Sequence, residues 1–285
     1  MNDNVTRTDL KPEPLHENLD DFIAKELLVK SYDGTEVPLS VIHHKNIRMD
    51  GNNPCLLMGY GSYGISMTPY FSTTTMAWLE TGGIYAVAHV RGGGEFGDEW
   101  HRAGQKATKS NTWKDFIACA EYLIQENYTS KEKIAGLGGS AGGITVGMAM
   151  IENPDLFTAM INQVGATNMI RILESPSGPA NIPEFGNPAD PEEFKSLLNM
   201  DTYYNIKNGI EYPAHLITGG LNDPRTIVWE PAKFAARLQT AQAGKKPILL
   251  RIDFESGHGI GDTKSQAFRE YADIFTFLLW QFGEI

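Results

Sequence analysis

Lys133-Ile-Ala-Gly-Leu-Gly-Gly-Ser-Ala-Gly-Gly143 is the stretch that decides the fold. It opens with a short apolar run typical of a buried strand, and the apolar segment 141–151 behind it is typical of a helix. Between them, Gly138 to Gly142 match the pattern G-x-S-x-G, in which a sharp, strained turn raises the serine above a sheet. Glycines on both sides let strand and helix pass closely, and the N–H groups of the helix start face the serine. We therefore predict that Ser140 is a nucleophile. The alternative is a glycine-rich connection with an ordinary capping serine.

Strand-like runs and helix-like segments alternate outward from this stretch. Asp33-Gly34 is a strong hairpin signal between the first two runs, and Thr112 and Asp115 are expected to cap the start of the first long helix. The expected strands are 27–31, 37–43, 55–58, 84–90, 133–137, 159–164, 214–218 and 247–254, and the expected helices are 113–124, 141–151, one from about 231, and 265–282. Such alternation predicts an α/β fold with a mostly parallel sheet and helices on both faces. Its active site is expected at the carboxyl ends of the strands.

Two segments depart from the alternation. Residues 1–20 are polar, carry two prolines, and are expected to form an extended N-terminal arm or a linker remnant. Residues 171–210 are rich in Pro, Gly, Asn and Asp and are expected to form an excursion over the active-site edge. The remainder, within 21–285, is expected to be the catalytic domain.

The base and the acid that a serine nucleophile needs are sought after it in the chain. In the α/β-hydrolase fold, which the serine turn and the alternation predict, the order is serine, acid, histidine. Only His215 and His258 follow Ser140; the first lies inside an expected strand and is assigned to the core, whereas His258 lies in a glycine loop beyond the last strand. Asp223 follows the strand that ends at residue 218. An Asx-turn before Pro224 is the alternative for this aspartate, but its place between serine and histidine favours the acid. Three other aspartates are less well placed: Asp155, Asp201 and Asp253.

Composition excludes several function classes. The 285 residues carry a formal net charge of -11, which disfavours nucleic acid and anionic membrane surfaces as partners. No apolar run approaches the roughly 20 residues that span a bilayer, and the N-terminal residues lack a secretory signal pattern, so a cytoplasmic location is expected. Cys55 and Cys119 are expected to be buried free thiols.

No metal or cofactor site is expected. His43 and His44 are neighbours on a strand and face opposite sides, so they cannot hold one metal together. Gly92-Gly-Gly94 lacks the lysine and serine of a phosphate-binding loop and is expected to be a tight turn.

Several ordered segments together resemble the catalytic domain of the prolyl oligopeptidase family of serine peptidases, from about residue 26 to the end. The segments are Gly59-Tyr-Gly-Ser-Tyr-Gly64, Arg91-Gly-Gly-Gly-Glu-Phe-Gly97 with Trp100-His101, Gly138-Gly-Ser-Ala-Gly-Gly143, Asn153-Pro-Asp-Leu-Phe157, Gln163-Val-Gly165, Asp223-Pro-Arg225 and Gly257-His-Gly259. The resemblance implies an acyl-enzyme mechanism and action on short peptides.

The resemblance also implies roles for individual residues. Tyr60 matches the tyrosine whose hydroxyl contributes to the oxyanion hole, and the backbone N–H of Ala141 is the expected second donor. Arg225 matches the arginine that holds a substrate carbonyl, and Tyr63 and Phe185 fall where the family has aromatic pocket walls. Tyr63 and Phe185 could equally serve as plain packing.

The chain departs from the family pattern in two respects. Asn181 stands where proline-specific members have a tryptophan, which argues against a proline preference. The family also carries a β-propeller of several hundred residues, for which 285 residues leave no room. The chain is therefore expected to be a catalytic fragment or a small hydrolase.

Three functions remain open at this point. The first is a short-peptide hydrolase. The second is a small-molecule carboxylesterase that uses the same triad in an open site, and the third is an inactive binding module. The sequence also leaves homo-oligomer formation open.

Overall fold

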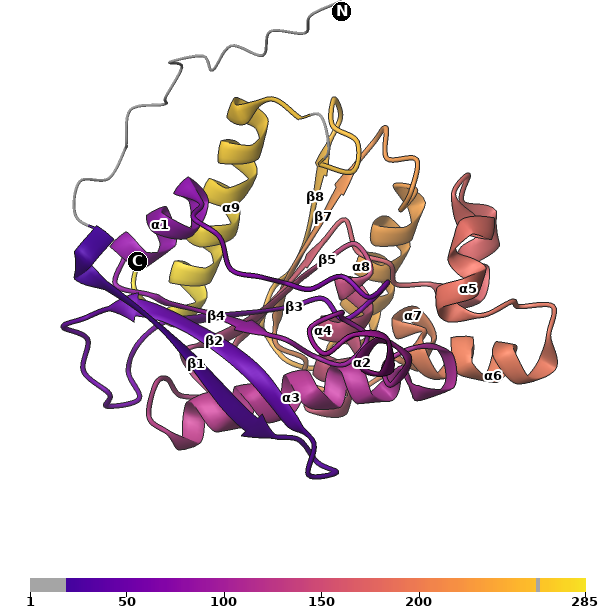
Figure 1. Cartoon of the computed structure of the whole chain (residues 1–285). Coiled ribbons are helices and arrows are strands. Elements are labelled where there is room, and N and C mark those ends of the chain that lie inside the picture. Colours follow the sequence, from indigo (N-terminus) through magenta and orange to yellow (C-terminus); the bar gives the residue numbers. More distant parts are fainter. Residues whose placement is uncertain (1–18, 260–261) are drawn as a thin grey trace, which may run out of the picture.

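A single eight-stranded sheet organises the part of the chain that the computed structural model describes, residues 19–259 and 262–285 (Figure 1). The strands are β1 (Phe22–Lys30), β2 (Glu36–His44), β3 (Cys55–Gly59), β4 (Ile84–Ala88), β5 (Ile134–Gly139), β6 (Ala159–Gln163), β7 (Ala214–Gly220) and β8 (Ile248–Asp253). Their order across the sheet is β1-β2-β4-β3-β5-β6-β7-β8. β2 runs antiparallel to its two neighbours, β1 and β4. The strands β3 to β8 are all parallel to one another. The predicted mostly parallel sheet is confirmed.

The first two strands form the predicted hairpin around Asp33-Gly34. The Gly34 N–H donates to the Ser31 carbonyl at 2.9 Å, and Gly34 has φ +85°, which glycine adopts without strain. β1 begins at Phe22, five residues before the expected strand, because its backbone pairing with β2 continues as far as His44. Exposed residues in this part of an edge strand give no hydrophobic alternation that a sequence pattern could reveal.

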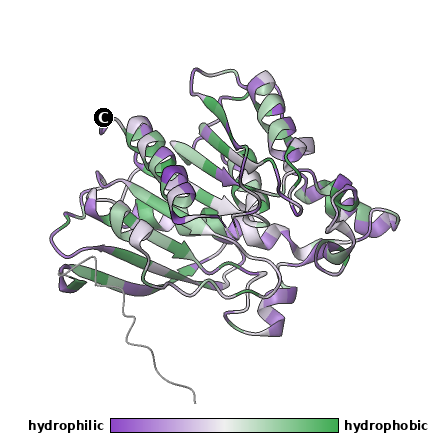
Figure 2. Ribbon diagram, turned by 90° about the horizontal axis from the view of Figure 1, so that it is seen from above, coloured by the Kyte–Doolittle hydropathy of each residue, from purple (hydrophilic) through white to green (hydrophobic). Residues whose placement is uncertain are grey.

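Helices cover both faces of the sheet, as predicted. One face carries α3 (Ser110–Gln125), α4 (Gly142–Glu152) and α8 (Trp229–Ala241), and the other carries α1 (Thr73–Glu80) and α9 (Lys264–Phe282). Neighbouring residues Leu56 and Leu57 of β3 enter the two separate apolar cores, since side chains alternate along a strand. Hydrophobic residues gather along the strands, and hydrophilic ones lie on the outer sides of the helices (Figure 2).

The sequence does not predict α1. Three successive threonines give its segment little helical pattern. The helix is held instead by Trp78, which is fully buried and donates its indole N–H to the Ile84 carbonyl at 2.8 Å.

The start of α3 corrects one expectation. The helix begins at Ser110, so Thr112 and Asp115 lie inside its first turns and do not cap it. Thr112 Oγ1 donates to the Arg91 carbonyl at 2.7 Å. The fully buried Asp115 carboxylate accepts hydrogen bonds from the Arg91 side chain at 2.7 and 2.9 Å and from Ser31 Oγ at 2.6 Å. A buried guanidinium requires a carboxylate partner, and this requirement outweighs the local capping pattern.

The segment between β6 and β7 contains short helices. They are η3 (Met169–Glu174), η4 (Gly178–Asn181), α5 (Ile182–Phe185), α6 (Pro191–Met200) and α7 (Thr202–Asn205). Asp190 caps α6 by accepting from the Glu192 and Glu193 N–H groups. The other short helices are η1 (Leu19–Asp21), α2 (Asp98–Arg102) and η2 (Lys106–Thr108).

Cys55 and Cys119 are fully buried free thiols, as predicted, and burial raises the pKa of each. Within residues 19–259 and 262–285, no helix has both the length and the apolar character needed to cross a bilayer. The N-terminal arm proposed for residues 1–20 lies outside the described residues except for its last two positions.

Asp115→Asn is expected to lower the free energy of unfolding by about 3 kcal/mol, because breaking a buried ion pair leaves the Arg91 charge poorly compensated. The measurement is urea denaturation. Asp98→Asn is the matched control, because Asp98 pairs with Arg102 on the surface, where both side chains are more than 60% exposed, and exposed pairs contribute little. Equal losses in the two variants would contradict the assignment.

Candidate active site

The carboxyl ends of the parallel strands meet at one edge of the sheet. The connection from β3 leads away through α1 to β4 on one side, whereas β5 lies on the other side of β3, so the strand order reverses there. Open α/β sheets bind ligands outside such a reversal. Tyr60 follows β3 and Ser140 follows β5, and both line the cavities at this edge.

Ser140 lies at the tip of a strained turn between β5 and α4. Its φ is +53°, a left-handed conformation that costs a residue other than glycine about 1–3 kcal/mol. Neighbouring backbone offsets this cost, because the Ser140 N–H donates to the Gln163 carbonyl at 2.9 Å and its carbonyl accepts from Ala166 at 2.8 Å. The end of β6 therefore fixes the position of the serine.

Two glycines allow the close approach that this turn needs. A Cβ on Gly138 would lie 2.2 Å from the Gly142 carbonyl oxygen, and a Cβ on Gly142 would lie 2.8 Å from the Gly59 carbonyl oxygen. Side chains at either position would force strand, helix and neighbouring turn apart. The geometry is that of the predicted strand–turn–helix motif.

Ser140, His258 and Asp223 form one hydrogen-bonded chain. Ser140 Oγ lies 2.8 Å from His258 Nε2, and His258 Nδ1 lies 2.6 Å from Asp223 Oδ2. The side chains of Asp223 and His258 are 0% and 7% exposed, so water competes little for these contacts. A carboxylate at Nδ1 fixes the tautomer that leaves Nε2 as the acceptor facing the serine.

Asp223 also makes the Asx-turn that was its alternative interpretation. Its Oδ1 accepts from the Arg225 N–H at 2.8 Å and the Thr226 N–H at 3.0 Å, while Oδ2 faces the histidine. The two interpretations hold together, because a carboxylate has two oxygens and the turn orients the one that remains.

One histidine and two aspartates that the sequence analysis did not assign to the triad have structural roles. His215 is fully buried against the Phe234 ring, and burial lowers its pKa to about 3, so it is the predicted core residue. Asp201 caps α7 through the Tyr204 N–H at 2.7 Å. Asp253 has a role that the sequence did not reveal: its Oδ1 accepts from Glu255 and Ser256 at 2.9 Å, which holds the loop that carries His258.

A second serine–histidine–carboxylate arrangement lies beside β4, and its residues line neither of the cavities that contain Ser140. Ser40 Oγ is 2.7 Å from His89 Nε2, and His89 Nδ1 is 3.3 Å from Glu95. Ser40 is only 2% exposed and donates to Glu26. A buried hydroxyl that already donates its proton to a carboxylate is unsuited to attack a substrate.

Two cavities flank Ser140, of about 270 and 310 Å³. The smaller extends past His258 towards Gln163, Arg251 and Glu270. The larger is lined by all the residues that the resemblance implicates in substrate or oxyanion binding, namely Tyr60, Tyr63, Ala141, Asn181, Phe185 and Arg225. The structure thus brings together side chains from four separate parts of the chain.

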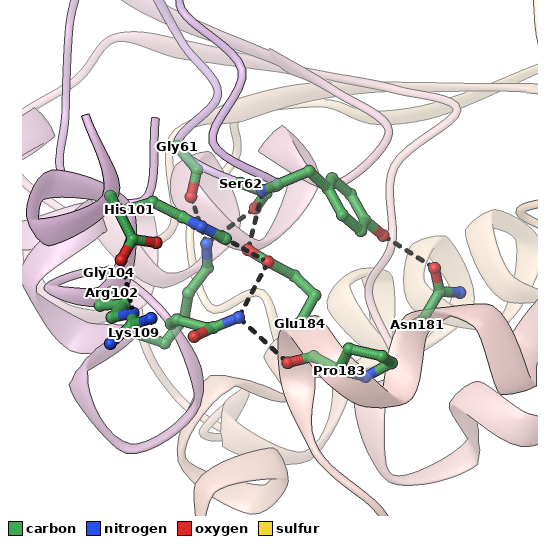
Figure 3. Close-up of polar contacts among 12 residues, drawn as sticks. Gly61, Ser62, His101, Arg102, Gly104, Lys109, Asn181, Pro183 and Glu184 are labelled. Carbon is green, nitrogen blue, oxygen red and sulfur yellow. Dashed lines mark hydrogen bonds and ion pairs between the residues drawn. The ribbon is translucent and has the colours of Figure 1, made fainter. Parts of the chain in front are cut away.

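The tyrosines of the larger cavity are held in their neutral form. Burial, with a contribution from Glu184, raises the pKa of Tyr60 to about 12, so its hydroxyl remains a hydrogen-bond donor at neutral pH. The Tyr63 hydroxyl donates to Asn181 Oδ1 at 2.8 Å (Figure 3). The Tyr63 ring meets the Phe185 ring edge to face at 5.4 Å. These contacts join the turn after β3 to α5 as one wall of the cavity.

The carboxylate behind this wall was missed in the sequence. Glu184 is 4% exposed and accepts from the Tyr63 N–H at 2.8 Å. A glutamate in a polar, helix-poor segment has the pattern of a surface residue, and its only sequence signal is the neighbouring Phe185 in a family-like segment.

Comparison with known proteins gives the chain its relatives. The model of the prolyl oligopeptidase family matches residues 69–284. The prolyl endopeptidase of Elizabethkingia miricola is 38% identical over 267 residues, which cover 93% of this chain and 38% of that protein. Dipeptidyl aminopeptidase BI of Pseudoxanthomonas mexicana is 35% identical, with 92% and 37% covered.

Solved structures agree with this comparison. A structure from a study of two prolyl endopeptidases has a TM-score of 0.90 at 38% identity and covers 93% of this chain and 39% of its own. Oligopeptidase B from Leishmania major has a TM-score of 0.88 at 34% identity, with 93% and 37% covered. The chain spans less than two fifths of the length of these relatives. Together with the α/β-hydrolase sheet, these matches show that the chain belongs to the prolyl oligopeptidase family.

Proposed function

We propose that the protein is a serine hydrolase that cleaves short peptides through an acyl-enzyme, with Ser140 as nucleophile, His258 as base and Asp223 as the acid that orients the base. The observation that carries the proposal is the hydrogen-bonded chain of these residues beside a cavity at the sheet edge. The relatives are named prolyl endopeptidase and dipeptidyl aminopeptidase, and these names support peptides rather than simple esters as the proposed substrates of this protein.

In the proposed acylation step, Ser140 Oγ attacks the substrate carbonyl carbon and its proton passes to His258 Nε2. The tetrahedral intermediate then collapses, and the same proton goes to the leaving amine as the C–N bond breaks. Water then attacks the carbonyl carbon of the acyl-enzyme and gives a proton to His258. The ester bond to Ser140 breaks, Ser140 regains its proton from His258, and the carboxylic acid product leaves. Asp223 stays ionised and stabilises the transient imidazolium.

The oxyanion is proposed to bind between the Tyr60 hydroxyl and the Ala141 N–H. Tyr60 follows β3 beside Ser140, and Ala141 is the N-cap residue of α4. The positive end of the helix dipole adds to the stabilisation of the developing charge.

The larger cavity is proposed to take the substrate residue on the acyl side. Arg225 would hold a substrate carbonyl, and Tyr63, Asn181 and Phe185 would form the pocket wall. Asn181 offers an amide hydrogen-bonded to Tyr63 rather than an indole face, so we propose no strong preference for proline.

Access to the site is proposed to be open within this chain. Residues of η3, η4 and α5 line the cavity beside Ser140, and the excursion 171–210 would act as a partial cover. Two statements from the sequence stay predictions: the cytoplasmic location, and the absence of nucleic acid and membrane partners. Homo-oligomer formation stays open.

Ser140→Ala is expected to abolish both turnover and labelling by a fluorophosphonate probe. His258→Ala and Asp223→Asn should each lower kcat by orders of magnitude. Adding Ser140→Ala to either should cost little more, since a triad acts as a unit. The measurement is kcat with a fluorogenic peptide, normalised to folded protein. His215→Ala is the control, and the assignment of the base fails if this variant loses turnover while His258→Ala keeps it.

Tyr60→Phe is expected to lower kcat about 10²-fold with a smaller effect on KM, because one oxyanion donor contributes about 3 kcal/mol to the transition state. Steady-state kinetics check this. Tyr32→Phe removes the hydroxyl of an exposed tyrosine on the β1–β2 hairpin and should change neither constant. A Tyr60→Phe effect on KM alone would instead assign Tyr60 to the pocket wall.

Peptides of increasing length should be cleaved without a sharp size limit, and short acyl esters should turn over faster than the matching amides. An amide needs its backbone held close to the attack geometry, and an open site supplies less holding surface. The test is a length series of fluorogenic peptides beside acyl esters. A steep cutoff at short length, with esters no faster than amides, would refute the open site.

A further inference from the structure

The turn that carries Tyr60 and Tyr63 has an unfavourable backbone conformation. Gly61 and Gly64 have φ +73° and +63°, and between them Tyr63 has φ +59° without being glycine. Such a residue keeps this conformation only where its surroundings hold it. The direction of the Tyr63 side chain, whose hydroxyl donates to Asn181 Oδ1, depends on that support.

Glu184 supplies the support from α5. Its Oε1 accepts from the Tyr63 N–H at 2.8 Å, and its Oε2 lies 2.7 Å from His101 Nε2 and 3.4 Å from Gln105 Nε2 (Figure 3). The carboxylate is 4% exposed, so these contacts compete with little water. Glu184 stands between Asn181 and Phe185 in the sequence. One short helical segment therefore carries the supporting carboxylate together with two residues of the cavity wall.

Lys109 holds the same turn from the start of α3. Its fully buried ammonium contacts the Gly61 carbonyl and donates to Ser62 Oγ at 2.7 Å, and it lies 5.6 Å from the centre of the Phe185 ring. Burial lowers the pKa of Lys109 to about 7, and the charge of Glu184 opposes this shift. The turn is thus held between the buried Lys109 amine and the buried Glu184 carboxylate, and the charge of Glu184 favours the protonated form of Lys109.

We propose that Glu184 is a positioning residue for substrate selection: its carboxylate fixes the Tyr63 backbone against α5 and so sets the shape of the Tyr63–Asn181–Phe185 wall. The proposal rests on the function proposed above, since it assigns this wall to a substrate side chain. Glu184 acts through Tyr63 and does not line the larger cavity itself.

The position of Glu184 predicts which substrates feel its loss. A peptide whose side chain fills the larger cavity of about 310 Å³ meets the wall, whereas p-nitrophenyl acetate carries only a methyl group beyond its carbonyl and fills little of that cavity. Neutralising Glu184 should therefore raise KM for the peptide and leave the small ester unaffected.

The kinetic experiment compares wild type with Glu184→Gln. We expect KM for a fluorogenic peptide amide to rise about tenfold, the scale of one lost charge-assisted hydrogen bond. We expect kcat/KM for p-nitrophenyl acetate to stay within about twofold. In a Tyr63→Ala background, Glu184→Gln should change the peptide KM by less than about twofold, because its route of action is already gone.

Glu193→Gln is the matched control. Glu193 also ties the segment after β6 to the 105–109 region, through Lys106 and the Asn187 N–H, but it does not contact the turn after β3. This variant should leave both substrates unchanged. If it raises the peptide KM as much as Glu184→Gln does, general loosening of the segment explains the effect and the proposal fails.

A second measurement does not depend on catalysis. Hydrogen exchange of the Tyr63 amide, followed by NMR, should become at least about tenfold faster in Glu184→Gln and stay unchanged in Glu193→Gln. An unchanged exchange rate, an unchanged peptide KM, or an equal loss with both substrates would overturn the proposal. Failure of wild type to react with a fluorophosphonate would refute the proposed function instead, and the exchange result would still decide whether Glu184 holds Tyr63.

Discussion

The strained backbone at Ser140 is the constraint on which the site depends. A serine at φ +53° is held by the Gln163 and Ala166 backbone, so β6 must lie beside β5 with its carboxyl end at the same level. The parallel pairing of these strands meets that requirement. The helices on both faces bury the strands in two hydrophobic cores and so shield their hydrogen bonds from water. The nucleophile's place is therefore a property of the sheet as a whole.

Two buried ionic clusters among the described residues join parts of the chain that are distant in sequence. Asp223 has His258 and two backbone N–H groups. Arg91 has Asp115 and Asp33. Each ion loses its hydration on folding and recovers the loss only where several donors or acceptors converge. Such clusters fix the geometry of the turns that contain them, and here those turns either carry the site or lie behind it.

The segment between β6 and β7 connects the reaction centre to the choice of substrate. Its residues line the larger cavity, and its contacts with the turn after β3 pass through Tyr63, Asn181 and Glu184. Changes in this segment could alter the pocket without moving Ser140, because the nucleophile is held independently by β5 and β6. Loops on a rigid sheet commonly vary in this way.

The sequence alone determined the sheet class, the serine turn and the chain order of serine, acid and histidine. Those features depend on local patterns: apolar runs of strand length, glycines at a fixed spacing, and polar residues directly after strands. It could not reveal that Asp115 binds Arg91 instead of capping α3, that Trp78 holds α1, or that Glu184 lies behind Tyr63. The partners in the last case are 121 positions apart, and those of His101 and Glu184 are 83 apart. Only the tertiary structure decided these contacts. The partner of a buried polar or charged group is the group that lies nearest in the folded chain, and no local spacing in the sequence encodes that distance.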